Sequence, residues 1–367
     1  MGRHKLKRKK FLIIILIIIL VLAVGFAIYV MYGSYKIKQL SEMTFEEMLA
    51  YTTDGNDDAI ITVGIIRDGE MSYTVYGKDG TILPQDEYIY EIGSITKTFT
   101  SSLLCKAISE GRISLEDRID KYLELPQKDY YPNIKRLVTH TSGYKAFYFE
   151  KPMISNFLHG ENDFNGISEE MIRSRIGKIN LEDKSYQFTY SNFGMAVLGL
   201  VLEEVYGSDY TSLMNDYIRN DLGLLNTKIF HENADLENYW KWTEGDGYIP
   251  AGAILSNITD VMKYTNMHMT EKPEYLSLAH EVLAQIDVSN ATNEIMGIHM
   301  NEVGSGWIID KENDIIWHNG ATGDFNSYLG FNKEKQIGVV ILSNLPPDYR
   351  IPATVMGVEL LTFEIVN

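Results

Sequence analysis

At 367 residues the chain is long enough for one large domain or two moderate ones, and its 45% hydrophobic content indicates a folded core. Six of the 33 Lys and Arg residues lie among residues 1–10, so the remainder carries 27 basic against 50 acidic side chains. This acidic surplus, without a basic stripe interleaved with aromatic residues, excludes nucleic-acid binding as the class of function.

The N-terminal segment indicates a membrane anchor. Residues 11–30, FLIIILIIILVLAVGFAIYV, form an uninterrupted apolar stretch of about the length that a helix needs to cross a bilayer. The basic residues before it predict a cytoplasmic tail over 1–10, a transmembrane anchor over 11–32 and a main domain outside the membrane. A cleaved signal peptide is the alternative, but its apolar core is usually only about 7–15 residues long. The sequence therefore predicts a single-pass protein of the cell membrane with an extracellular domain.

The next segments predict a spacer and then the start of the main domain. Residues 33–58 end in the polar run DGNDD and are interpreted as a juxtamembrane spacer, so the main domain is predicted over 59–367. Two β-branched or aromatic runs, 59–67 and 71–76, flank the turn sequence Asp68-Gly69-Glu70, which predicts a hairpin.

A helix is predicted over 94–110, because its apolar residues recur with helical spacing and Gly111 follows it. Cys105 lies on this helix and is the single cysteine of the chain, so no intramolecular disulfide can form. We expect its thiol to be buried in the core. An exported protein without disulfides is suggestive of a bacterium.

Helical patterns dominate the middle of the chain, including 194–206 and 208–220, and strand patterns return near the C-terminus. The predicted strands cover 306–310, 315–318, 326–331 and 337–342, followed by a helix over 352–364. Strands at both ends predict an α+β fold of the α/β-sandwich type, in which one antiparallel sheet is built from the N- and C-terminal segments and flanked by helices. The sheet part is predicted over 59–113 and 300–367, and an inserted, mainly helical lobe over 114–299.

Ser94 and Lys97 form the sharpest functional motif. They are three residues apart at the start of a predicted helix, so their side chains share a face and can hydrogen-bond. An adjacent base is the minimal device that makes a serine hydroxyl nucleophilic. Ser142 and Lys145 have the same spacing, but Gly143 places them in a predicted turn, where their side chains need not share a face.

Five collinear segments over residues 60–345 resemble the serine β-lactamase and penicillin-binding protein superfamily. They resemble its class C side, which also contains D-Ala-D-Ala carboxypeptidases, D-aminopeptidases and esterases. The segments are IGSITKTFT from Ile92, LVTHTSGY from Leu137, YSNFGMAVLGLVLE from Tyr190, PAGAILSNITDV from Pro250 and HNGATGDFNSYLGFN from His318. Their order favours Ser94 over Ser142 as the nucleophile.

The resemblance implies the roles of the site residues. Ser94 would be the nucleophile, and Lys97 and Tyr190 would transfer its proton, although the sequence leaves open which of the two is the acylation base. Asn192 would orient a substrate amide. The backbone N–H groups of Ser94 and Ala321 would bind the oxyanion. No metal or organic cofactor is implied.

The third motif departs from the common family pattern, because His318-Asn319-Gly320 stands where many members have Lys-Thr-Gly. The resemblance places His318 and Gly320 in the substrate-binding group. A histidine with a reference pKa near 6.5 is mostly neutral at pH 7 and presents less charge to a substrate carboxylate. This substitution argues against antibiotic hydrolysis as the main activity. His140 and Gly252 also belong to the resembling segments, and we assign them structural roles.

Three functions fit these motifs. The first is a D-Ala-D-Ala carboxypeptidase or D-peptidase that acts on cell-wall peptides through an acyl-enzyme at Ser94. The second is an esterase, amidase or β-lactamase that uses the same site, and the third is a penicillin-recognising or wall-binding protein without turnover. The expected partners are a small peptide or β-lactam-like substrate and, through the N-terminal helix, the membrane; the oligomeric state is left unassigned.

Overall fold

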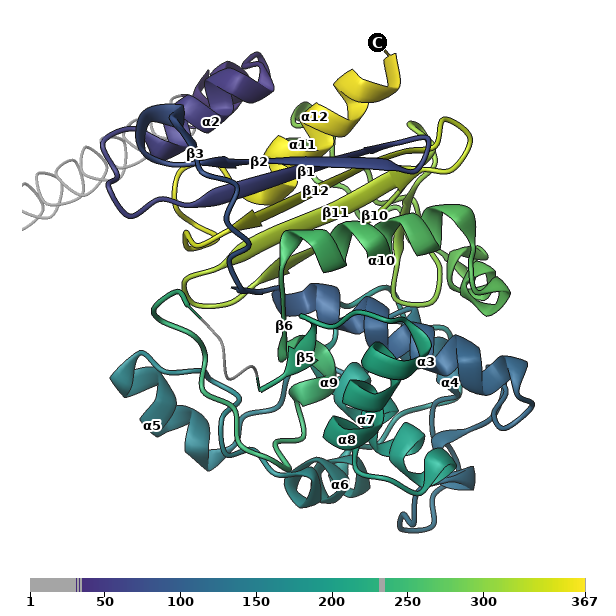
Figure 1. Ribbon diagram of the computed structural model, residues 1–367. Coiled ribbons are helices and arrows are strands. Elements are labelled where there is room, and N and C mark those ends of the chain that lie inside the picture. Colours follow the sequence, from purple (N-terminus) through teal and green to yellow (C-terminus); the bar gives the residue numbers. More distant parts are fainter. Residues whose placement is uncertain (1–30, 32, 34, 231–234, 367) are drawn as a thin grey trace, which may run out of the picture.

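The computed structural model describes residues 31, 33, 35–230 and 235–366 (Figure 1). Nine strands pair antiparallel in the order β3-β2-β1-β12-β11-β10-β9-β8-β7. The pairing of β1 with β12 joins the two ends of the domain and confirms the predicted sheet. The strands are β1 Ile61–Arg67, β2 Glu70–Tyr76, β3 Ile82–Leu83, β7 Ala284–Gln285, β8 Glu302–Val303, β9 Ile308–Asp310, β10 Ile315–Ala321, β11 Asn326–Asn332 and β12 Ile337–Ser343.

Both faces of the sheet are covered by helices. Successive side chains of a strand point to opposite faces, so Val339 and Ile341 of β12 join one core and Val340 and Leu342 join the other. The first core contains α2 (Phe45–Thr53) and α12 (Ala353–Val366), and the second contains α3 (Thr96–Ser109) and α10 (Ile258–Thr270). In Figure 1, α12 and α10 lie on opposite sides of the strands. A strand buried on both faces explains the unbroken apolar run of β12.

Helix α2 lies within the segment interpreted as a spacer, but it is packed against the domain. Thr44 and Glu47 form a capping box at its start. Phe45, Met48 and Leu49 are buried in the same core as α12. The packed domain therefore begins before residue 59, because this short helix covers part of the sheet.

The predicted anchor cannot be compared with the structure. The tail over 1–10, residues 11–30 and residue 32 lie outside the described residues. Within the part of the chain that the structure describes, no helix is long and apolar enough to span a bilayer.

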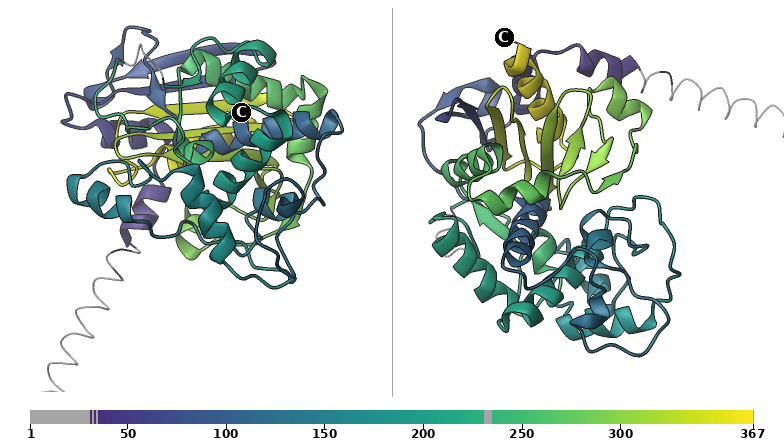
Figure 2. Two further views of the ribbon diagram at one scale, coloured as in Figure 1. Left: turned by 90° about the horizontal axis from the view of Figure 1, so that it is seen from below. Right: turned by 90° about the vertical axis from the view of Figure 1, so that its right-hand side faces the viewer.

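Part of the range predicted for the helical lobe, 114–299, packs with the large sheet. Helix α10 and strand β7 fall within that range, yet α10 packs on the large sheet and β7 is its edge strand. Residues 291–298, which include α11 (Ala291–Ile295), lie beside α12 on the sheet part (Figure 1). The segment from residue 114 to α9 forms the lobe, which meets the sheet part along α3, drawn in blue in Figure 2. The lobe contains α4 Ile134–Val138, α5 Lys151–His159, α6 Glu169–Lys178, α7 Asn192–Tyr206, α8 Tyr210–Asp216 and α9 Ile249–Gly252. A small sheet of β4 (Tyr90–Glu91), β6 (Ile254–Ser256) and β5 (Lys228–Ile229) links it to the start of α3.

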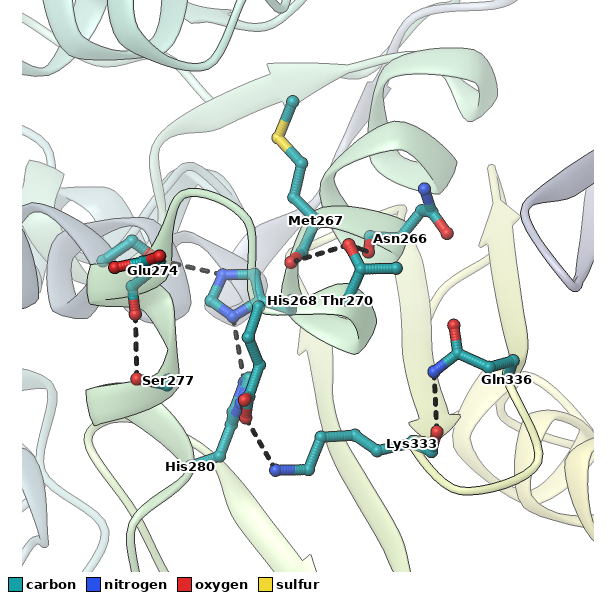
Figure 3. Close-up of polar contacts among 11 residues, drawn as sticks. Asn266, Met267, His268, Thr270, Glu274, Ser277, His280, Lys333 and Gln336 are labelled. Atoms are coloured by element: carbon teal, nitrogen blue, oxygen red, sulfur yellow. Dashed lines mark hydrogen bonds and ion pairs between the residues drawn. The ribbon is translucent and has the colours of Figure 1, made fainter.

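A buried histidine pair, His268 and His280, links α3 to Lys333 on the sheet part; Figure 3 shows the two histidines and Lys333. His268 Nε2 lies 3.0 Å from Ser102 Oγ, and His268 Nδ1 lies 3.0 Å from His280 Nε2. Glu271 Oε1 lies 3.5 Å from His280 Nδ1 and forms an ion pair with Lys333 Nζ at 2.8 Å. Burial lowers the pKa of both imidazoles, so the pair is neutral in the folded protein.

The His280 pKa predicts loss of stability in acid. A histidine kept neutral by folding stabilises the protein fully above its ordinary pKa of about 6.5, and this contribution is lost as the pH falls below that value. Relative to a His280→Gln variant, the wild-type free energy of unfolding should decrease by about 2 kcal/mol between about pH 7.5 and about pH 5. Denaturant unfolding at the two pH values measures this difference. If the free energy of unfolding changes with pH equally in the wild type and in His280→Gln, the His280 pKa is the same in the folded and unfolded states.

Candidate active site

Ser94 and Lys97 are brought together at the start of α3. Ser94 lies in a short 3-10 turn, Gly93–Ile95, that leads directly into the helix. Lys97 Nζ is 2.8 Å from Ser94 Oγ and donates a second hydrogen bond, of 2.6 Å, to the carbonyl oxygen of Ala251 in α9. Ser94 is partly exposed, whereas Lys97 is fully buried. A substrate can therefore reach the hydroxyl while the amine stays shielded from water.

Burial sets the protonation state of Lys97. Its amine forms no ion pair among the described residues, and desolvation holds its pKa well below the usual range. A neutral amine in hydrogen-bonding contact with a serine hydroxyl can accept the hydroxyl proton. Lys97 thus has both the position and the protonation state that a general base requires.

Tyr190 completes the cluster around the hydroxyl. Its ring centroid is 4.9 Å from Lys97 Nζ, and its phenol lies close enough to Ser94 for that side chain to offset part of the effect of burial on the Tyr190 pKa. Burial raises the Tyr190 pKa above its usual range, so the phenol keeps its proton at neutral pH. The lowered pKa of Lys97 suits a base, and the raised pKa of Tyr190 suits a group that keeps and donates its proton. The two shifts therefore favour Lys97 as the base and Tyr190 as a proton donor.

The end of β10 supplies a backbone N–H group beside Ser94. Thr322 N donates to Phe325 O, so the next pair along the ladder, Ala321 and Asn326, is a pair without mutual hydrogen bonds. The Ala321 N–H therefore points away from β11, toward the Gly93 turn. A Cβ on Gly93, whose φ is +49°, would lie 2.6 Å from Ala321 N. Only glycine lets these two backbones approach closely enough to share an oxyanion.

Gly320, on β10, has a similar steric role at the same contact between β10 and the turn. A Cβ at this position would lie 1.9 Å from the carbonyl oxygen of Ile92. The same oxygen accepts a hydrogen bond of 3.0 Å from Ser327 Oγ on β11. Gly320 thus fixes the distance between β10 and the turn that carries the nucleophile.

Asn192 is the first residue of α7 and leaves its side chain available. Ser191, the residue before it, caps the helix by accepting a hydrogen bond of 2.8 Å from Gly194 N. The Asn192 amide forms no side-chain hydrogen bond among the described residues. The capping role therefore belongs to Ser191, and Asn192 can bind a substrate amide.

His318 is buried and carries no charge at neutral pH. Its Nδ1 lies 2.6 Å from the carbonyl oxygen of Asn319, to which it donates, and this tautomer leaves Nε2 as an acceptor. Burial, with a smaller contribution from the nearby Lys97, lowers its pKa to about 3. Its ring centroid is 6.4 Å from that of Tyr190. At this position the site offers a neutral acceptor in place of the lysine cation.

His140 positions the loop that carries Tyr190. Its Nδ1 accepts a hydrogen bond of 3.2 Å from Ser191 N, and its carbonyl oxygen accepts one of 2.8 Å from Thr189 N. Its ring centroid lies 4.8 Å from that of Tyr190. Burial lowers its pKa to about 3, which preserves the acceptor on Nδ1. These contacts hold the backbone on both sides of Tyr190, and the sequence likewise predicts a structural role for His140.

The second Ser-x-x-Lys motif is not a catalytic pair. Ser142 is buried in the turn, and its hydroxyl accepts a hydrogen bond of 3.2 Å from Tyr144 N. Lys145 is exposed to solvent, with its amine 6.0 Å from the ring centroid of Tyr148. The two side chains therefore lie in different surroundings.

Glu91 is a site-adjacent residue that the sequence reasoning missed. This buried carboxylate accepts hydrogen bonds from Thr322 Oγ1, at 2.6 Å, and from Trp240 N, at 2.7 Å. Glu91 thus links β4, which precedes Ser94, to Thr322, which follows Ala321. Burial raises its pKa to about 7. The only signal in the sequence is a single acidic residue within the apolar run YIYEIG.

Comparison with known proteins places this site in a family. The Beta-lactamase family model matches residues 58–355. The chain belongs to this family. A class C β-lactamase from Rhodobacter sphaeroides is among the structural neighbours and shares the fold, with a TM-score of 0.64 at 18% identity over 84% of this chain and 95% of that chain.

Individual relatives are distant. Protein flp of Staphylococcus aureus (strain MW2) is 24% identical over 301 residues, which cover 76% of this chain and 56% of that protein. This β-lactamase-family chain spans about half the length of the curated relatives it matches.

Two further solved structures share its fold. The β-lactamase/D-alanine carboxypeptidase from Yersinia pestis, complexed with citrate, has a TM-score of 0.70 at 17% identity and covers 91% of this chain and 99% of its own. The D-amino acid amidase from Ochrobactrum anthropi SV3, complexed with L-phenylalanine, has a TM-score of 0.66 at 17% identity and covers 87% and 98%.

The Lys97 amine provides a direct prediction. Lys97→Met keeps an apolar side chain of similar length but removes the base, so acylation of Ser94 by 4-nitrophenyl acetate should slow by about 10²–10⁴-fold. Release of 4-nitrophenol in stopped flow measures the rate. Lys145→Met is the matched control and should leave the rate unchanged. Equal losses in the two variants would remove Lys97 from its assigned role.

Proposed function

We propose that this chain is a serine hydrolase that forms an acyl-enzyme at Ser94. The observation that carries this proposal is the fully buried Lys97 amine 2.8 Å from the Ser94 hydroxyl, where burial lowers the pKa of the amine. The Ala321 N–H, which faces the same turn, supplies the second part of the machinery. Membership of the Beta-lactamase family supports the same reaction class.

The reaction follows from these positions. Ser94 Oγ attacks the substrate carbonyl carbon while its proton passes to Lys97 Nζ. The backbone N–H groups of Ser94 and Ala321 stabilise the oxyanion. When the tetrahedral intermediate collapses, the bond to the leaving group breaks, and Tyr190 relays a proton to that group. Water then attacks the ester carbonyl and gives a proton to the Lys97–Tyr190 pair; the bond between the acyl carbon and Ser94 Oγ breaks, the proton returns to Oγ, and the acid is released.

We propose D-amino-acid peptides of the cell wall as substrates, cleaved by D-Ala-D-Ala carboxypeptidase or D-peptidase chemistry. The names of the Yersinia pestis and Ochrobactrum anthropi proteins include D-alanine carboxypeptidase and D-amino acid amidase, which supports this class. Asn192, with its free amide, would orient the peptide group.

A second candidate is an amidase or esterase that acts on uncharged acyl compounds. It is favoured by His318, which is buried, neutral and an acceptor on Nε2, so it provides no cation for a terminal carboxylate. β-Lactams and D-Ala-D-Ala peptides both carry a carboxylate, so the same property weakens β-lactam hydrolysis and favours uncharged acyl compounds over carboxypeptidase substrates.

We further propose that the domain lies outside a bacterial cell membrane and is held there by the predicted anchor over 11–32. The apolar stretch and the basic residues before it support this topology. Protease added to intact cells should degrade the domain. Complete protection in intact cells, with degradation after lysis, would contradict the topology.

A covalent-labelling experiment tests the acyl-enzyme. Incubation with a fluorescent penicillin should label the wild type, and Ser94→Ala should abolish the label. Release of D-Ala from a D-Ala-D-Ala-terminated peptide then distinguishes a carboxypeptidase from an esterase. Stable acylation without turnover of any peptide, amide or ester would instead identify a penicillin-recognising protein. Absence of Ser94-dependent label and of esterase activity would overturn the proposal.

His318 should control the preference for charged substrates. His318→Lys introduces an amine that is held as a cation when a substrate carboxylate binds beside it, and a charge-assisted hydrogen bond contributes about 1.5–3 kcal/mol. The ratio of kcat/KM for a peptide with a free terminal carboxylate over its amidated form should therefore rise about tenfold or more. His159→Lys, at an exposed position on α5, is the control. An unchanged ratio in His318→Lys would show that this position does not face the substrate terminus.

A further inference from the structure

A second hollow lies in the helical lobe and is lined almost entirely by apolar side chains. Its volume is about 220 Å³, and it is lined by Phe147, Phe149, Met153, Phe157, Asp163 and Phe164. Three of these rings are exposed to solvent, with Phe157 at 77%. Clustered exposed aromatic side chains mark binding surfaces, because leaving them in water is unfavourable.

The hollow is held open by buried polar contacts. Asn156, on the inner face of α5, donates a hydrogen bond of 2.8 Å to Asn165 O. Asn162, which is almost fully buried, donates one of 3.0 Å to Lys241 O. These bonds fix the loop on either side of Phe164, so the floor of the hollow is formed before any ligand binds.

The loop that forms one side of the hollow is bonded to the start of α7, where Asn192 lies. Phe147 follows Ala146, whose carbonyl oxygen accepts a hydrogen bond of 3.1 Å from Phe193 N. Lys145 O accepts one of 2.7 Å from Ser191 Oγ. The loop that carries Phe147 is therefore bonded to the residues on both sides of Asn192.

Phe164 connects the hollow to the loop that follows β10. The ring centroid of Phe164 is 6.3 Å from that of Trp240. Trp240 lies over Gly323, where a Cβ would be 2.8 Å from the indole nitrogen, and Gly323 is two residues beyond Ala321. The hollow is thus linked through the Phe147 loop to the residues that flank Asn192, and through Phe164 and Trp240 to the loop after Ala321.

We propose that this hollow, the apolar subsite, binds the apolar end of the substrate's acyl group, either an aliphatic chain or an aromatic side chain. The inference rests on the proposed function and names the substrate class of the same site. Its size suits such a group, because a cavity of about 150 Å³ is enough for benzene. The one acidic lining residue, Asp163, disfavours a carboxylate at this end of the substrate.

The chain-length dependence of ester hydrolysis tests the subsite. Each buried methylene raises affinity up to about fourfold, so kcat/KM should rise about tenfold or more from 4-nitrophenyl acetate to the hexanoate. In Phe157→Ser the hexanoate-to-acetate ratio should fall to within about threefold of unity. A Phe157→Ser ratio equal to that of the wild type would overturn the inference.

Leu158→Ser is the matched control. Leu158 is on the same helix and is 73% exposed, but it does not line the hollow, so this variant should keep the wild-type ratio. A collapse of the ratio in both variants would indicate a general effect of the exposed face of α5, such as contact with a lipid surface, and would contradict the subsite.

A binding measurement separates this inference from the proposed function. In the Ser94→Ala protein, calorimetric titration with hexanamide should give saturable binding that is weakened about tenfold in Ser94→Ala/Phe157→Ser, with acetamide binding far more weakly than hexanamide. This result can hold even if no ester is hydrolysed. Hydrolysis that depends on Ser94, without any chain-length preference in rate or binding, would leave the proposed function standing and remove the subsite.

Discussion

The chemistry proposed here depends on the complete burial of one lysine amine. Lys97 lies at the junction of the sheet part and the helical lobe, where its amine contacts Ser94 Oγ and the Ala251 carbonyl oxygen. A buried ammonium without an ion-pair partner would cost several kcal/mol, so the amine is stable there in its neutral form. The two neighbouring imidazoles, His140 and His318, have their pKa values lowered to about 3 and add no positive charge of their own at neutral pH.

The large sheet contributes the end of β10, with the Ala321 N–H, to the site. Because β9 pairs with β10 only as far as Trp317, the last residues of β10 have a free edge beside the turn that carries Ser94. Gly93 and Gly320 allow the two backbones to meet, although more than two hundred residues separate them in sequence. The β1–β12 pairing brings the two ends of the domain together. Substitutions at either glycine should therefore act on the site and on the sheet at once.

The sequence alone could predict those parts of the fold that have a strong local pattern. The apolar run of β12 and the helix from Ser94 follow from periodicity, and the collinear motifs single out Ser94 over Ser142. The packing of α2 could not be predicted, because a nine-residue helix beside a polar run has the pattern of a spacer. The same holds for α10, since periodicity defines an apolar face but not the element that it covers.

Other parts of the site depend on tertiary contacts. Burial rather than residue type lowers the Lys97 pKa and raises that of Glu91, and no local pattern reports burial by segments distant in sequence. The apolar subsite is similar, because its aromatic residues come from a loop, from α5 and from the loop after it. Each of these residues alone is an ordinary surface or core residue.

The most direct measurement is the titration of Lys97 itself. In protein labelled with carbon-13 at the lysine ε-carbons, one NMR resonance should titrate far below the reference lysine pKa of about 10.4, and it should be absent from Lys97→Met. That result would establish a neutral base beside Ser94. If every lysine resonance titrates near the reference value, Lys97 is charged at neutral pH, and the proposed mechanism is wrong.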